Sequence, residues 1–123
     1  MIGLILLFTG SFFVFVWGIA HLFPTKNVVR GFGEISADNK NIITMEWIIE
    51  GASLIFIGLL VAAVTIICKH DPVSRTVYIM SFIFLNILSL ISLFTGFKVS
   101  FLPFKLCPFI FTGSSFLILI GSI

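Results

Sequence analysis

The chain alternates between long apolar stretches without charge and short segments that carry almost all of its charged residues. The uncharged stretches cover residues 1–25, 51–68, 76–97 and 106–123. Each is close to the roughly 20 residues that an α-helix needs to cross about 30 Å of hydrocarbon. The pattern therefore predicts transmembrane helices at 2–23, 43–68, 76–97 and 103–123, in a single four-helix membrane domain over residues 1–123.

Composition supports this pattern and excludes most soluble classes of protein. Of the 123 residues, 59% are hydrophobic and 10% are charged, whereas ordinary soluble domains carry about 25% charged residues. The four stretches leave no room for a soluble catalytic or nucleotide-binding domain. A net charge of +2 is too small to indicate a nucleic-acid partner. We predict an all-α integral membrane bundle.

Proline and polar residues mark the expected ends of the helices. Pro24 is expected to end the first helix, and Asp38 is a good N-cap for a helix that continues to residue 68. Pro108 fits a first turn better than a position deeper in a helix, although residues 103–107 are needed for the last span. Residues 18–20 look like a signal-peptide cleavage site, but no basic segment precedes the apolar run, so we expect a retained helix.

The segment 24–42 is the largest between the expected spans. Val28, Phe32 and Ile35 follow the spacing of one helical face, which favours a short amphipathic helix at the membrane interface. Gly31 and Gly33 are expected to interrupt that helix.

Positively charged residues indicate the orientation in the membrane. Lys69 and Arg75 lie in the connection between the second and third helices, and the other five basic residues lie in the first and third connections. Because cytoplasmic loops are enriched in Lys and Arg, segments 24–42 and 98–105 are expected in the cytoplasm. This prediction places both termini outside a cell membrane. The five basic residues of the two cytoplasmic connections are Lys26, Arg30, Lys40, Lys98 and Lys105.

Two carboxylates at the start of the second span carry the strongest indication of function. Glu46 and Glu50 are four residues apart and therefore share a helix face. Gly51, Gly58 and Ala62 form a neighbouring stripe of small residues, which allows close approach of another transmembrane helix. Glu50 lies at the edge of this stripe and one turn deeper than Glu46, so it is the stronger candidate.

The first helix has a matching arrangement. Gly10, Gly18 and His21 lie along one face, and His21 is near the end from which the two acids enter the membrane. Polar residues of the third and fourth spans are expected to converge on the same pocket. The candidate residues for a ligand or proton site are His21, Glu46, Glu50, Asn86, Ser92 and Thr112.

Two interpretations of the acids stay open. In the structural one, they are hydrated near the interface, pair with Lys40 or Lys105, or cap nearby backbone. In the functional one, they hold a proton, a lipid head group or a small ligand, because carboxylates inside membranes are costly and mostly functional. Two acids and one distant histidine, without a Glu-x-x-His or histidine-rich motif, do not indicate a metal site. No motif indicates a cofactor.

Tryptophan and cysteine positions add further expectations. Trp17 and Trp47 are typical of the aromatic belt that anchors helices at a membrane interface. Cys68 is expected at the outer end of its helix and Cys107 at the inner end of another. A disulfide needs Cα atoms within about 7 Å, so this placement argues against a disulfide oxidoreductase.

The end of the first helix, residues 15–24 (FVWGIAHLFP from Phe15), is similar to the corresponding segment of DoxX-like four-helix membrane proteins. The length of the chain and its four spans are also similar to that family. His21 stands where the family often has a basic residue, and residues 25–50 match no signature of the family. The resemblance implies a bacterial inner-membrane protein, in some members associated with respiratory or redox complexes, and it implies no catalytic residue.

These observations favour a small binding or accessory membrane protein with a polar site near the cytoplasmic face. Two alternatives stay open. A proton-coupled small-molecule transporter would need both faces to reach the acids, which suggests a dimer. A membrane enzyme acting on a lipid or isoprenoid would need a water-accessible base and a slot open to lipid. The partners expected are membrane lipids and a second copy or a larger membrane complex.

Overall fold

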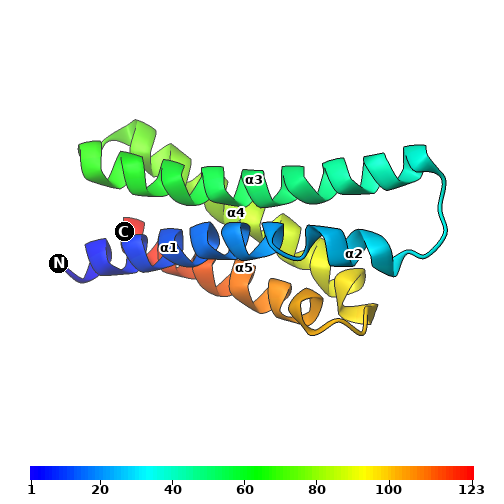
Figure 1. Ribbon diagram of the computed structural model, residues 1–123. Coiled ribbons are helices and arrows are strands. Elements are labelled where there is room, and N and C mark those ends of the chain that lie inside the picture. The colour runs from blue at the N-terminus through cyan, green and yellow to red at the C-terminus, as the bar shows by residue number, and fades with distance from the viewer.

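A computed structural model describes residues 1–123 and contains helices as its only regular structure. Four of the helices are long and apolar enough to cross a membrane, which confirms the all-α four-helix bundle and a multi-pass membrane protein. The elements are α1 (Ile2–Leu22), α2 (Thr25–Gly31), α3 (Ala37–Cys68), α4 (Pro72–Phe94), the short 3₁₀ helix η1 (Gly96–Lys98) and α5 (Leu102–Ser122) (Figure 1).

The four long helices run roughly along one axis, and the two ends of the bundle differ (Figure 1). Both chain termini and the turn between α3 and α4 lie at one end, which we call the terminal end. The short helix α2 and the connection between α4 and α5 lie at the other, which we call the α2 end. α1 packs against α3 and α5, and α4 packs mainly against α5. Residues near the ends of α1, α3 and α5 can therefore meet at the α2 end.

The distribution of polarity is that of a membrane protein. Small hydroxyl residues lie inside the bundle, and Ser11, Thr65 and Ser115 are all at most 5% exposed. Large apolar side chains lie outside, with Phe56 63% and Ile67 81% exposed. Lipid solvates apolar side chains as well as a protein core does, so helix association depends on close packing and interhelical hydrogen bonds.

Glycine allows the close packing of α1 against α3. A Cβ atom added at Gly18 would lie 2.8 Å from the carbonyl oxygen of Gly51, and one at Gly58 would lie 2.7 Å from that of Ser11. The close helix approach that these stripes of small residues favour is therefore confirmed at Gly18 and Gly51. Gly10 differs, because an added Cβ would lie 2.9 Å from the carbonyl oxygen of Ser114 on α5.

Hydrogen bonds hold α3 and α4 together only near the terminal end. The hydroxyl groups of Thr65 and Tyr78 lie 3.0 Å apart, and Ser74 donates to the carbonyl of Val64 over 3.4 Å. Beyond these contacts the two helices run apart toward the α2 end (Figure 1).

The segment between α1 and α3 is partly as predicted. A short helix is present, and it ends at Gly31, two residues before Gly33 adopts a φ of 72°. Phe32 and Ile35 follow the end of α2, so they do not share a helical face with Val28. The buried residue of α2 is instead Val29.

Two helix ends differ from the sequence-based expectation. Ser36 is the N-cap of α3, and its side chain accepts a hydrogen bond from the backbone of Asn39 over 3.2 Å. The expected cap, Asp38, lies in the first turn, where its negative charge favours the helix dipole. Pro108 lies inside α5, beyond the first turn. Its missing N–H leaves the carbonyl of Phe104 without the usual partner in the helix.

Candidate functional site

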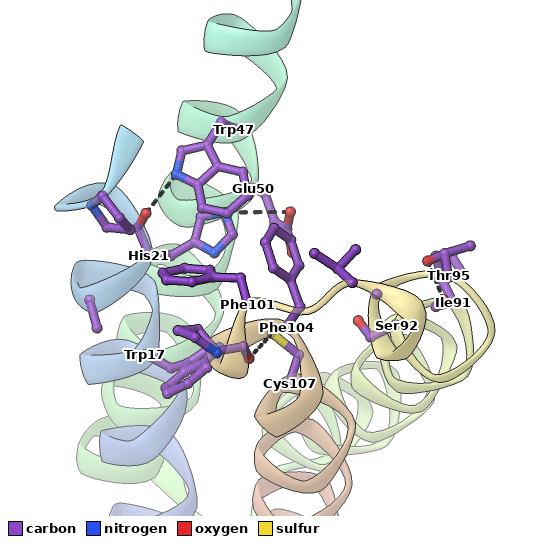
Figure 2. Close-up of a pocket in the computed structure, with 15 residues that line it drawn as sticks. Trp17, His21, Trp47, Glu50, Ile91, Ser92, Thr95, Phe101, Phe104 and Cys107 are labelled. Carbon is purple, nitrogen blue, oxygen red and sulfur yellow. Dashed lines mark hydrogen bonds and ion pairs between the residues drawn. The ribbon is translucent and has the colours of Figure 1, made fainter. Parts of the chain in front are cut away.

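A cavity of about 400 Å³ lies at the α2 end, between α1, α3, α4 and the start of α5 (Figure 2). We call it the inner cavity. Its lining is mostly apolar, with a few polar groups on different helices. The lining residues are Trp17, Ala20, His21, Pro24, Trp47, Glu50, Ile91, Ser92, Thr95, Gly96, Val99, Phe101, Pro103, Phe104 and Cys107.

His21 and Glu50 meet at this cavity. Nε2 of His21 lies 3.5 Å from Oε2 of Glu50, and this is the only ion pair or potential ion pair between side chains (Figure 2). The His21 side chain is 6% exposed and the Glu50 side chain is 40% exposed. The contact of Gly18 with Gly51 lies about one turn away and brings the two helices close enough for this pair to form.

Trp47 holds His21 in place. Its indole Nε1 donates to the carbonyl oxygen of His21 over 2.7 Å. The two rings are stacked, with centroids 3.9 Å apart and an interplanar angle of 16°. The edge of Phe104 on α5 approaches Trp47, with centroids 5.4 Å apart. Trp47 thus links α1, α3 and α5 around the cavity, a role that goes beyond the expected membrane anchor.

The cavity contains polar atoms whose hydrogen-bonding capacity is not used within the protein. Nε1 of Trp17 and Nε2 of His21 are buried and make no hydrogen bond. A buried polar group without a partner is uncommon and costs about 1–3 kcal/mol. Both atoms belong to residues that line the inner cavity but are themselves covered, so a bound molecule would reach them only after the neighbouring side chains shift.

Glu46 lies outside the inner cavity, on the flank of the bundle. It is exposed and forms no ion pair, so the pairing with Lys40 or Lys105 that the structural interpretation allowed does not occur. Glu46 lines a second hollow of about 450 Å³, which we call the α3–α4 groove. The lining residues of this groove are Ile42, Ile43, Glu46, Trp47, Ile49, Glu50, Ser53, Phe84, Leu88, Ile91 and Ser92.

The inner cavity and the groove have a common wall. Trp47, Glu50, Ile91 and Ser92 line both hollows. Glu50 is therefore reached both from the bundle interior and from the flank between α3 and α4.

The polar residues of α4 and α5 divide between two places. Ser92 lines the inner cavity as predicted. Asn86 instead donates to Ser115 over 2.9 Å, and the hydroxyl groups of Ser89 and Thr112 lie 2.7 Å apart. The expectation that Asn86 and Thr112 reach the pocket is therefore wrong. Their side chains join α4 to α5, where interhelical hydrogen bonds stabilise packing in lipid.

Sequence reasoning missed the part of the site that follows α4. Thr95, Phe101, Phe104 and Cys107 line the inner cavity and come from the connection around η1 and the first turns of α5. The sequence did contain a signal, because residues 99–104 are uncharged and include four large apolar residues between Lys98 and Lys105. An apolar loop at a membrane interface favours packing against the bundle.

No group of three or more His, Cys, Asp or Glu side chains lies close enough to hold a metal ion. No Lys or Arg lines the inner cavity or the groove. The inner cavity is therefore a mostly apolar, aromatic hollow whose ionisable side chains include the Glu50 carboxylate and the His21 imidazole.

Comparisons with family models, curated proteins and solved structures find no match to this chain. The functional argument therefore depends on the geometry of the site.

Proposed function

We propose that this chain is a ligand-binding or accessory membrane protein whose ligand site is the inner cavity. One observation carries the proposal: the cavity brings the only ionisable pair of the structure, His21 and Glu50, together with buried polar atoms that have no hydrogen-bond partner. Purely structural pairs are expected to be fully hydrogen-bonded, because unmet polar groups are costly away from water. A mostly apolar hollow with a few polar groups is typical of a small-molecule site.

The ligand proposal is tested by filling the cavity from α4. Ser92 lines the cavity and makes no side-chain hydrogen bond, so Ser92→Phe adds volume without removing a polar contact. We expect native mass spectrometry to show an organic molecule retained by the wild-type protein after extraction from membranes, and much less of it retained by Ser92→Phe.

Ser122→Phe is the matched control, because Ser122 lies at the terminal end and lines neither hollow. It should retain the molecule as the wild type does. Equal retention by all three proteins, or no retained molecule in the wild type, would contradict a ligand site in the inner cavity.

We further propose that the protein lies in a bacterial inner membrane with the α2 end in the cytoplasm. The support is the distribution of basic residues and the resemblance of the first helix to DoxX-like proteins, which stays a prediction. This orientation places the His21 and Glu50 site near the cytoplasmic face.

Orientation is tested at Cys68, which is exposed at the terminal end. A maleimide that cannot cross membranes should label this thiol in intact cells, and Cys68→Ser should remove the label. Cys107 is buried, so its expected lack of labelling holds in either orientation and is not informative. Labelling of Cys68 only after the membrane is permeabilised would reverse the orientation.

A further inference from the structure

We infer that the ligand of the inner cavity is an amphiphile with a cationic ammonium head and a single alkyl chain, which enters from the bilayer through the α3–α4 groove. This inference rests on the proposed ligand site and names its chemical class and its route.

Charge is the first argument. Glu46 and Glu50 line the route, and no Lys or Arg lines either hollow. The only partner of Glu50 is His21, whose side chain is 6% exposed, lines the cavity and makes no hydrogen bond through Nε2. When His21 is neutral, the carboxylate of Glu50 has no protein cation beside it. An ammonium group would supply one, whereas a phosphate or carboxylate head would meet like charge.

The aromatic lining is the second argument. Trp17, Trp47, Phe101 and Phe104 surround the space next to the His21 and Glu50 pair (Figure 2). Aromatic faces attract cations, and clusters of them are a recurrent site for quaternary ammonium groups. The combination of several aromatic rings with one carboxylate favours an ammonium head over a neutral polar head.

The groove supplies a place for an alkyl chain. Ile49, Phe84 and Ile91 line it and are 50%, 44% and 55% exposed, so the groove opens on the flank of the bundle that faces lipid. At 1.5 Å per residue, the part of α3 between Glu50 and Cys68 is about 27 Å long, close to the thickness of the hydrocarbon. The head would therefore lie near one membrane interface, with the chain extending along the deeper part of the groove.

The size of the two hollows favours one chain over two. Volumes of about 400 and 450 Å³ are those of sites for drug-sized molecules. The α3–α4 groove is lined by residues of both helices and shares a wall with the inner cavity, so the route from the side does not require either helix to unfold.

The test uses the two tryptophans of the chain, Trp17 and Trp47, which both line the inner cavity. The protein is placed in nanodiscs of phosphatidylglycerol, a lipid without an ammonium group, and protein fluorescence is titrated with dodecylpyridinium, a cationic amphiphile that quenches tryptophan. We expect saturable quenching. Dodecyltrimethylammonium should reverse it, whereas neutral dodecanol and tetramethylammonium, which lacks a chain, should reverse it much less.

Variants assign the binding to Glu50. Glu50→Gln keeps the shape of the side chain and should raise the half-quenching concentration by about tenfold or more, because the charge attraction is lost in a partly desolvated site. Glu50→Asp should restore part of the affinity. Glu34→Gln, an equal change of charge at an exposed residue between α2 and α3, should leave the titration unchanged.

Two results would overturn the inference. One is reversal by dodecanol as effective as that by dodecyltrimethylammonium, together with unchanged binding by Glu50→Gln, which would show a site for neutral amphiphiles. The other is the absence of saturable quenching in folded wild-type protein. In either case, a molecule retained by the wild type but not by Ser92→Phe would leave the proposed ligand site standing. If Glu50→Gln does not fold, the comparison of the competitors on the wild type decides the question.

Discussion

Replacing Gly18 with Leu is expected to lower the free energy of unfolding by about 3 kcal/mol or more, at the upper end of the cost of overpacking. A Cβ atom at this position would lie 2.8 Å from both the carbonyl oxygen of Gly51 and the backbone nitrogen of Ile55. Both atoms belong to the backbone of α3, so no side chain can move aside. The helices would have to separate, and the His21 and Glu50 contact would be lost with the packing.

Gly113→Leu is the matched control for this prediction, because nothing lies within 4 Å of a Cβ added at Gly113. It should not destabilise the bundle, since Leu is also the better helix former. The measurement is the thermal midpoint of each variant in detergent. Equal midpoints for Gly18→Leu and Gly113→Leu would show that α1 does not pack on α3 through this glycine.

Alanine variants refine the same test. Gly18→Ala meets backbone atoms first, whereas Gly51→Ala first meets the end of the Leu22 side chain, which can change its rotamer. We therefore expect Gly18→Ala to be the more destabilising of the two.

Replacing Trp47 with Ala is expected to cost about 3 kcal/mol, near the lower end of the range for large aromatic residues in a core. The change removes the stacking on His21, the edge contact with Phe104 and the hydrogen bond to the His21 carbonyl. These contacts join three helices around the inner cavity. The thermal midpoint should fall, and His21 should lose the fixed position in which it faces Glu50.

Trp47→Phe and Trp17→Phe separate the hydrogen bond from the packing. Trp47→Phe keeps an aromatic ring but loses a bond of 2.7 Å, so a net loss of about 1 kcal/mol is expected. Trp17→Phe removes an N–H that makes no hydrogen bond and should cost less. If both tryptophans served only as membrane anchors, Trp47→Phe and Trp17→Phe would lower the thermal midpoint by the same amount. Equal midpoints would therefore favour that simpler role for Trp47.

The four spans could be predicted from the sequence because the requirement that produces them is local. A helix in lipid needs a continuous run of apolar residues, and charges have to lie outside it. The facing of Gly18 and Gly51 could also be predicted, since the helical repeat places each glycine on a known face and small residues favour helix contact. The predicted helix ends were less accurate, because several nearby polar residues can cap a helix. The N-cap of α3, for example, is Ser36 and not the expected Asp38.

The residues that line the inner cavity could be predicted only in part. His21, Glu50 and Ser92 were expected and line the inner cavity, whereas Asn86 and Thr112 join α4 to α5 instead. A polar residue in a span indicates that its face is turned toward protein, but it does not indicate which neighbouring helix it meets.

The number of spans, the shared end of the bundle at which His21, Glu46 and Glu50 lie, and the faces of α1 and α3 that meet all follow from the order of residues along the chain. The contact of His21 with Glu50, the joining of three helices by Trp47, and the closing of the cavity by Phe101 and Phe104 follow only from the folded arrangement. The reason is physical. Lipid and protein interior are similarly apolar, so burial does not select one partner for a helix face, and the choice depends on tilt, rotation and close packing among segments far apart in the chain.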